Sequence, residues 1–277
     1  MENPSYSPTP QPDTAPKSSH SARLLTALIG IPLVLLVVWL GGAAFRFLCL
    51  LLALGALREL QSALGKSERA GGAQLIGIVA YPAVGWAVWR GLSPNFALAV
   101  MGALLALCVI LSGRASRLNL PSVSMTFLAT FYVGLFGLLP ILRAGGNGEI
   151  FVLLLFSVWA SDTAAYYGGR AFGKTPLSPL SPGKTREGTL CGVFAATFVA
   201  ALIAGWARFD LSQGVILGLI VALCAPLGDL VESFWKREMG VKDLGTLLPG
   251  HGGILDRCDS ILFAALGFSL YFAWMAA

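Results

Sequence analysis

Residues 211–238 read LSQGVILGLIVALCAPLGDLVESFWKRE, and the chemistry changes sharply two thirds of the way along this stretch. The first part, Leu211–Gly228, carries no charge and is close to the roughly 20 residues that a helix needs to cross a bilayer. The second part begins with Asp229, and further acids and bases follow it. A carboxylate inside a membrane costs about 2.5–3.5 kcal/mol on insertion scales, so it marks function by default. We therefore expect a membrane helix whose end carries chemistry.

The composition of the whole chain is typical of a membrane protein. Hydrophobic residues make up 56% of the 277 positions and charged residues 12%, about half the charged fraction of a soluble domain. The net charge is +5, but no basic stripe recurs with aromatic residues, so we expect no nucleic-acid partner. The five cysteines lack metal-ligand spacing and are expected to pack in helices.

Uncharged runs recur along the chain and predict an all-α polytopic membrane protein with about nine transmembrane helices. The weakest of these runs contains Arg46, whose side chain can extend to the membrane surface. The predicted spans are Leu24–Gly42, Ala43–Leu57, Ala70–Trp89, Gly91–Gly113, Leu118–Leu142, Ile150–Gly169, Gly188–Ala207, Leu211–Gly228 and Ser260–Ala277.

The distribution of Lys and Arg predicts the orientation. With nine spans and an inner N-terminus, 15 of these residues fall in inner segments and 4 in outer ones. Because cytoplasmic loops are rich in Lys and Arg, the sequence predicts an N-in, C-out topology. The polar loops Arg170–Glu187 and Lys236–Leu255 then face the cytoplasm. Residues 1–22, rich in Pro, Ser and Thr, are predicted to form a disordered cytoplasmic tail before an integral membrane catalytic domain at 23–277.

The acidic residues gather near the C-terminus: six of the 14 lie between Asp229 and Asp259. Asp256 and Asp259, three residues apart, share one face at a predicted helix N-terminus, which favours anions. Together with Asp229 they are the hard oxygen ligands that Mg²⁺ prefers. The helix that continues from Asp229 carries a polar stripe of Asp229, Glu232, Ser233, Lys236 and Arg237.

Two further polar features leave alternatives open. His251 lies in the sequence GHGG, where it is either a phosphate donor, a base or a loop cap. Glu59, at the inner end of the second predicted span, is either a catalytic contributor or a lipid-headgroup anchor, and we interpret it as the anchor.

A second polar segment, Ser161–Gly192, reads SDTAAYYGGRAFGKTPLSPLSPGKTREGTLCG. Residues 168–175 match the pattern of a phosphate-binding P-loop, but a membrane helix precedes them and Pro176 follows, so we reject that interpretation. A glycine-rich basic loop remains, and it suits nucleotide phosphates. Asp162 lies within a predicted span, either as a structural partner of Tyr166 or as a nucleotide contact.

These segments resemble the phosphatidate cytidylyltransferases, also called CDP-diacylglycerol synthases. The C-terminal signature of that family has a Ser, then Lys-Arg, Lys-Asp, His-Gly-Gly and Asp-Arg-x-Asp, all at the spacing found within SFWKREMGVKDLGTLLPGHGGILDRCD. The segments SDTAAY and SPGKTREG resemble the family's second region. The resemblance implies an Mg²⁺-dependent enzyme that converts CTP and phosphatidate to CDP-diacylglycerol and pyrophosphate. It also implies a bacterial inner-membrane protein with its active site facing the cytoplasm.

The resemblance implies a role for each matching residue. Asp229 and Asp256 are the expected metal ligands, and Asp259 is either a third ligand or a residue that supports the other two. The expected binders of the triphosphate and the phosphatidate head are Lys236, Arg237, Lys242 and Arg257, and the site is completed by Ser233, Asp243 and His251. Lys184, Thr185 and Arg186, with Asp162 as a further candidate, are expected to contact the nucleotide. The sequence leaves a homodimer open.

Two other functions fit parts of the pattern. A CTP-dependent lipid kinase, such as a polyprenol kinase, would release CDP rather than pyrophosphate. An ion-coupled transporter would also carry acids among its helices. However, the chain has no inverted repeat and its charges gather at one membrane face, which disfavours a transporter.

Overall fold

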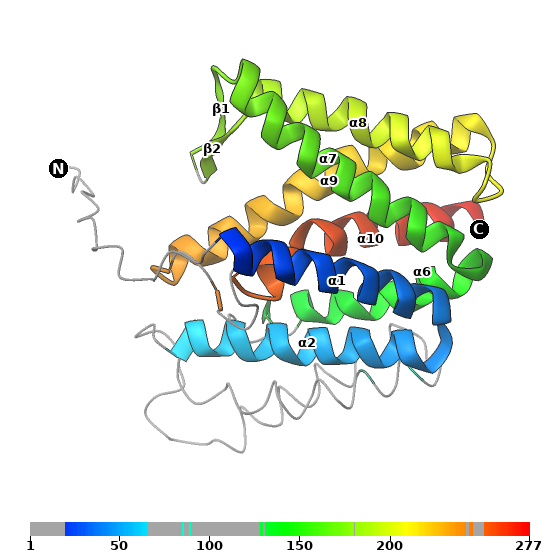
Figure 1. The fold of residues 1–277 in the computed structure, drawn as a ribbon, viewed down its shortest axis with the longest axis horizontal. Helices are drawn as coiled ribbons and strands as arrows, with labels where there is room; N and C mark the ends of the chain where they lie inside the picture. Colours follow the sequence, from blue (N-terminus) through cyan, green and yellow to red (C-terminus); the bar gives the residue numbers. More distant parts are fainter. Residues whose placement is uncertain are drawn as a thin grey trace, which may run out of the picture.

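The computed structural model describes residues 20–65, 85, 89, 128–129, 131–179, 181–241, 244–245 and 252–277. These residues form a bundle of helices with one small hairpin at its edge (Figure 1). In chain order the elements are α1 (His20–Leu40), α2 (Gly42–Gly65), the 3-10 turn η1 (Leu135–Gly137), α6 (Leu138–Ala144), the 3-10 turn η2 (Gly145–Gly148), α7 (Glu149–Phe172), β1 (Pro176–Ser178), β2 (Ser181–Thr185), α8 (Arg186–Ala204), α9 (Leu211–Glu238) and α10 (Leu255–Met275).

Four of the described helices, α7 to α10, are long and apolar enough to cross a membrane. Each corresponds to one of the last four predicted spans, although α8 ends at Ala204 rather than Ala207 and α10 at Met275 rather than Ala277. This is consistent with the predicted all-α membrane protein. The number of nine spans and the N-in, C-out orientation stay predictions. Two of the predicted spans, Ala70–Trp89 and Gly91–Gly113, lie outside the described residues except for Gly85 and Trp89.

The N-terminal elements differ from the predicted boundaries. Helix α1 begins at His20, so the last three residues of the predicted tail are helical, and residues 1–19 lie outside the described part. The weakest predicted span forms a helix of 24 residues, α2, which continues eight residues beyond Leu57. The described end of the span predicted at Leu118–Leu142 is interrupted by the 3-10 turn η1, which Gly134 precedes and Gly137 ends.

The loop predicted between α7 and α8 contains an antiparallel hairpin that the sequence did not indicate. Strands β1 and β2 pair Pro176 with Thr185 and Ser178 with Ser181, with an irregularity between the two pairs. Proline favours extended backbone in itself and in the residue before it, which suits short strands. The carboxylate of Glu187 accepts hydrogen bonds from the N–H groups of residues 174 and 175, at 3.1 and 3.2 Å, and so ties the start of the hairpin to α8.

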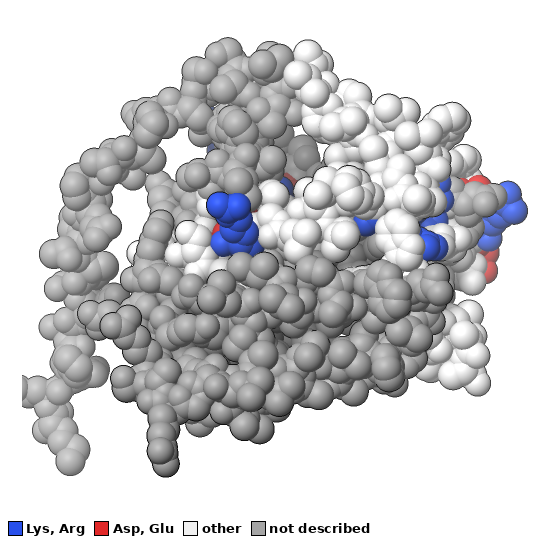
Figure 2. All heavy atoms as spheres, turned by 90° about the horizontal axis from the view of Figure 1, so that it is seen from below, with Lys and Arg blue, Asp and Glu red and all other residues white. Residues whose placement is uncertain are grey.

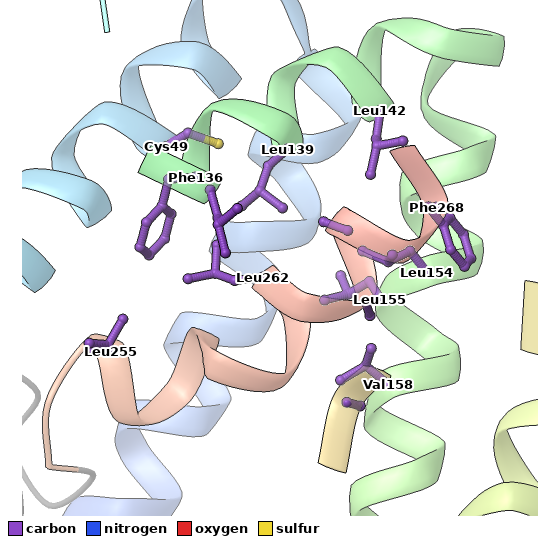
Figure 3. Close-up of a cluster of buried hydrophobic side chains, with 14 of the residues drawn as sticks. Cys49, Phe136, Leu139, Leu142, Leu154, Leu155, Val158, Leu255, Leu262 and Phe268 are labelled. Carbon is purple, nitrogen blue, oxygen red and sulfur yellow. The ribbon is translucent and has the colours of Figure 1, made fainter. Parts of the chain in front are cut away.

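The helices pack closely because small residues line their contacts. The buried residues of α8 recur at every fourth position and have little or no side chain, so the backbones of α7 and α9 can approach it. They are Gly188, Gly192, Ala196, Ala200 and Ala204. Larger apolar side chains fill the space between α6, α7 and α10, among them Leu139, Leu154 and Phe268 (Figure 3).

Large apolar side chains also point outward, as expected where lipid is the solvent. Phe194 and Phe198 on α8 are 75% and 69% exposed, and Leu223 on α9 is 67% exposed. In a soluble protein such a surface would drive association, whereas hydrocarbon chains solvate it. On the face shown in Figure 2 the described atoms belong mostly to uncharged residues, and the visible Lys and Arg side chains form small separate groups.

Candidate active site

A cavity of about 490 Å³ lies between α7, the hairpin, α9 and α10. This volume is within the range of about 300–1,000 Å³ that is usual for small-molecule sites. Its polar lining includes Asp162 and Arg170 from α7, Lys184 and Thr185 from β2, Thr189 from α8, Asp229 from α9, and Asp256, Arg257 and Asp259 from α10. The two polar segments predicted from the sequence begin 68 residues apart, at Ser161 and Asp229. They therefore meet in one place.

Three carboxylates form a tight cluster beside this cavity. One oxygen from each of Asp229, Glu232 and Asp259 lies within 4.8 Å of the others. Asp229 and Glu232 are three residues apart on α9 and share a face, whereas Asp259 comes from the second turn of α10. Glu232 and Asp259 are buried, with 1% and 6% exposure. Such crowding of buried negative charge is stable only with compensating cations or protons.

A glycine allows the two helices to meet at this point. A Cβ atom placed on Gly228 would collide with the carbonyl oxygen of Asp259, so any side chain at this position would push α10 away. Pro226, two residues earlier, lines the cavity and cannot donate the usual backbone hydrogen bond within α9. The backbone next to Asp229 is therefore suited to a close crossing of α9 and α10, and α9 lacks one backbone donor at Pro226.

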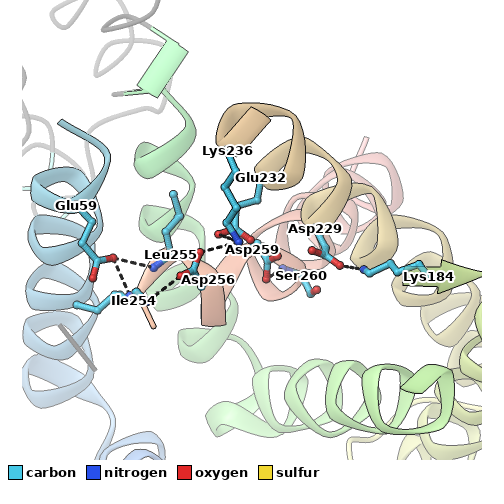
Figure 4. Close-up of polar contacts among 11 residues, drawn as sticks. Glu59, Lys184, Asp229, Glu232, Lys236, Ile254, Leu255, Asp256, Asp259 and Ser260 are labelled. Carbon is cyan, nitrogen blue, oxygen red and sulfur yellow. Dashed lines mark hydrogen bonds and ion pairs between the residues drawn. The ribbon is translucent and has the colours of Figure 1, made fainter. Parts of the chain in front are cut away.

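Two lysines compensate part of the negative charge (Figure 4). Lys184 of β2 forms an ion pair with Asp229. Lys236 is on α9, and its ammonium group contacts acids of both α9 and α10. Its Nζ lies 3.1 Å from Oε1 of Glu232 and 2.9 Å from Oδ1 of Asp256. Burial lowers the pKa of Lys184, and the carboxylate of Asp259 opposes this effect.

Asp256 has different partners from the three clustered carboxylates. Its Oδ1 pairs with Lys236, and its Oδ2 accepts a hydrogen bond of 2.8 Å from the N–H of Gly253. The predicted metal set was Asp229, Asp256 and Asp259, whereas the cluster in the structure contains Glu232 with Asp229 and Asp259. Sequence reasoning passed over Glu232 as a ligand, although its position one turn after Asp229 on the polar stripe was the available signal.

The hairpin presents the predicted nucleotide loop to the cavity. The Thr185 hydroxyl accepts a hydrogen bond from the N–H of Gly188 at 3.1 Å and so caps α8. Because Thr185 is both the cap of α8 and part of β2, the preceding Lys184 is held at the cavity. Arg186 begins α8, is exposed, and is not among the described residues that line the cavity.

The other residues predicted for the site differ in whether they line the cavity. Arg257 lines the cavity, whereas Ser233 and Arg237 lie on α9 but do not belong to the described lining. Lys242, Asp243 and His251 lie outside the described residues. Glu59, interpreted from the sequence as a lipid anchor, is instead buried at 4% exposure and accepts hydrogen bonds from the N–H groups of Ile254 and Leu255.

Known proteins resemble this chain over nearly its whole length. A family model described as "Cytidylyltransferase family" matches residues 21–275. The phosphatidate cytidylyltransferase of Brucella suis biovar 1 is 33% identical over 273 residues, which cover 94% of this chain and 95% of the relative. That of Staphylococcus aureus strain COL is 34% identical over 258 residues, covering 87% and 94%.

Identity is higher over a shorter region in another relative. The phosphatidate cytidylyltransferase of Helicobacter pylori strain 26695 is 47% identical over 146 residues, which are 50% of this chain and 53% of the relative. The chain therefore spans about half the length of this relative.

Proposed function

This chain belongs to the cytidylyltransferase family, and from that premise we propose that it is a phosphatidate cytidylyltransferase. The enzyme would transfer CMP from CTP to phosphatidate, giving CDP-diacylglycerol and pyrophosphate. The observation that carries this proposal is a cavity in which Asp229, Asp259 and Lys184 meet beside helices that are long and apolar enough to cross a membrane. In such a site the two aspartates can bind a metal cation, and the lysine can bind phosphate.

The chemistry requires positioning and charge neutralisation more than acid–base catalysis. A phosphate monoester has a second pKa of about 6, so the phosphatidate head is largely dianionic at neutral pH. One of its oxygens forms a bond to the α-phosphorus of CTP. The bond from that phosphorus to the oxygen that joins the α- and β-phosphates breaks, so the β- and γ-phosphates leave as pyrophosphate. Lys184 is proposed to contact the triphosphate, where its ammonium would stabilise the charge that develops on the leaving group.

The residues at the site fit a magnesium ion. Asp229, Glu232 and Asp259 supply hard oxygen donors within 4.8 Å of one another, which suits Mg²⁺ with water and phosphate as its other ligands. When bound, Mg²⁺ would neutralise and orient phosphate oxygens. In this proposal Asp256 acts chiefly by holding Lys236 in place, although the sequence-based set names it as a ligand.

Other side chains are proposed to complete the binding of the two substrates. Arg257 lines the cavity and is suited to the phosphatidate head or the triphosphate. Asp162, which also lines the cavity, is proposed as a nucleotide contact. The family pattern adds Ser233, Arg237, Lys242, Asp243 and His251 to this group. Arg186 is added as a basic residue of the same loop as Lys184, although the family pattern has an aromatic residue at its position.

We place the protein in the inner membrane of a bacterium, with the site facing the cytoplasm. Bacterial relatives and the excess of Lys and Arg in the inner segments support this location. CTP would then enter from the water, while phosphatidate would reach the cavity sideways from the bilayer.

The test is a transfer assay with the purified full chain in detergent. The protein is incubated with phosphatidate, Mg²⁺ and CTP labelled at the α-phosphate. The expected result is label in a lipid-soluble product, with release of pyrophosphate and complete loss of the reaction in EDTA. Label that remains in soluble CDP would indicate a lipid kinase instead, and absence of turnover would contradict the proposal.

A further inference from the structure

Helix α10 receives its N-terminal cap from a residue 195 positions earlier in the chain. The Oε2 of Glu59, on α2, lies 2.7 Å from the backbone nitrogen of Ile254 and 3.4 Å from that of Leu255 (Figure 4). Both N–H groups donate to this one oxygen. The side chain of Glu59 is buried, so the contact is shielded from water.

The residue at the N-cap position of α10 does not cap the helix with its own side chain. The first N–H groups of any helix have no partner within the helix, and a Ser, Thr, Asp or Asn usually supplies one. Here Ile254 occupies the N-cap position, has helical dihedral angles of −65° and −43°, and makes no side-chain cap hydrogen bond. The carboxylate of Glu59 takes over this task and also favours the positive end of the helix dipole.

The space around the Glu59 carboxylate is closed by two glycines. A Cβ atom on Gly253 would lie 2.6 Å from Oε2 of Glu59, and one on Gly245 would collide with the carboxyl group itself. Neither position can accept a side chain while Glu59 stays where it is. The described residues Gly245 and Gly253, which precede α10, therefore leave room for this carboxylate.

The cap is connected to the acid cluster by a short series of contacts. Gly253, beside Glu59, donates its N–H to Asp256 at 2.8 Å, and Asp256 pairs with Lys236 at 2.9 Å. Lys236 in turn pairs with Glu232 of the cluster at 3.1 Å. Asp259 follows Asp256 by three residues on the same helix, so any movement of the start of α10 moves both aspartates.

We propose that Glu59 is a positioning residue of the active site, which holds the first turn of α10 in place from α2 and thereby positions Asp256 and Asp259. Glu59 itself is not among the described residues that line the cavity, so it acts through α10 rather than on a substrate. The inference rests on the proposed function where it concerns catalysis, but the cap itself does not depend on that function.

Hydrogen–deuterium exchange of the purified full chain tests the cap without any assay of turnover. In the Glu59→Ala protein we expect the amides of residues 254–256 to exchange at least about tenfold faster than in the unchanged protein. Glu59→Gln keeps one acceptor oxygen, so its exchange should lie between the two. Exchange at the wild-type rate in both variants would overturn the proposal. If Glu59→Ala does not fold, the comparison is made with Glu59→Gln alone.

Glu149→Gln is the matched control. Glu149 is also a poorly exposed carboxylate in the first turn of a helix, α7, and it pairs with Arg208. It lies 13 residues before Asp162, about 20 Å along that helix. Exchange at residues 254–256 should be the same in this variant as in the unchanged protein.

Binding of Mn²⁺, used as a paramagnetic probe in place of Mg²⁺, shows whether Glu59 positions the metal ligands or only stabilises the end of α10. Residues that orient metal ligands typically change metal affinity by about 10- to 100-fold. We expect at least about tenfold weaker Mn²⁺ binding in Glu59→Gln and no change in Glu149→Gln. Faster exchange with unchanged Mn²⁺ affinity would leave Glu59 a structural cap only and would overturn its positioning role.

Turnover measurements separate the role of Glu59 from the proposed function of the protein. In Glu59→Gln we expect kcat to fall by roughly 10- to 100-fold, the size of effect known for slight misplacement of reacting groups, while KM for CTP changes less. If the unchanged protein makes no CDP-diacylglycerol, the proposed function fails, whereas the exchange and Mn²⁺ results still decide the role of Glu59.

Discussion

Lys236 and Asp256 form a 2.9 Å ion pair that joins the end of α9 to the first turn of α10. The same ammonium lies 3.1 Å from Glu232, so one lysine is shared by two acids from different helices. All three side chains are mostly buried, with exposures of 18% for Lys236, 2% for Glu232 and 6% for Asp256. A buried pair of this kind is costly to break, because the remaining charges lose their partner.

Replacing Lys236 with methionine should therefore reduce both stability and activity. Removal of one partner from a buried ion pair typically costs about 3–5 kcal/mol. We expect Lys236→Met to lower the temperature of thermal unfolding in detergent and to lose most turnover. Lys174→Met is the control, since Lys174 is exposed and does not belong to the described lining of the cavity. Equal unfolding temperatures in Lys236→Met and Lys174→Met would show that the ion pairs of Lys236 do not stabilise the protein.

The acid cluster predicts which substitutions weaken metal binding most. Asp229→Asn and Glu232→Gln should each weaken Mn²⁺ binding by more than about tenfold, because each removes a proposed ligand, and such losses exceed those of outer residues. Asp256→Asn should reduce turnover with a smaller effect on Mn²⁺ affinity. An equal loss of affinity in Asp256→Asn and Asp229→Asn would favour the ligand set predicted from the sequence.

Lys184 should matter for the nucleotide more than for the lipid. A hydrogen bond to a charged group contributes about 1.5–3 kcal/mol, so Lys184→Met should raise KM for CTP by roughly tenfold or more. The effect on KM for phosphatidate should be smaller. Steady-state kinetics with each substrate varied in turn measures the difference, and Lys174→Met in the same loop should behave like the unchanged protein. A selective rise in KM for phosphatidate would reverse the assignment.

Stability at acid pH should depend on Asp210, the N-cap of α9. Hydrogen bonds from the Ser212 hydroxyl and the Gln213 N–H hold the pKa of Asp210 below its usual value. Its stabilising effect is therefore complete above the ordinary carboxyl pKa of about 4 and is lost as the pH falls through the lowered value. The unfolding temperature of Asp210→Asn should lack this part of the acid dependence. Parallel curves for both proteins between pH 6 and the acid limit would contradict the prediction.

Much of the architecture could be read from local sequence. Runs such as Leu211–Gly228 and Gly188–Ala207 predict α9 and α8 because the length and polarity of a segment alone decide whether it suits a bilayer. That Asp229 and Asp259 lie close together was also predictable, since few acids occur in so apolar a chain and each is costly. The hairpin before α8 was not predicted, because its short strands have no hydrophobic alternation and depend on contacts with Glu187.

The partners of individual carboxylates could not be predicted. Asp256 and Glu232 look alike in the sequence as acids three residues from another acid, and only the crossing of α9 and α10 at Gly228 decides which one joins the cluster. The partners of Glu59 were even less predictable. In the sequence, a lone acid near a helix end resembles a surface anchor, whereas in the structure its buried cap contact joins residues 195 positions apart.

The sequence by itself determined the class of this protein, the helices that the last four apolar runs form, and the two polar segments that line the cavity. Hydropathy and charge are properties of each segment, and they act whatever the segment later touches. Only the tertiary structure decided which oxygens lie within 4.8 Å of one another, which lysine pairs with which acid, and what caps α10. The physical reason is that these contacts depend on where helices cross, and a helix crossing is set by packing between distant parts of the chain.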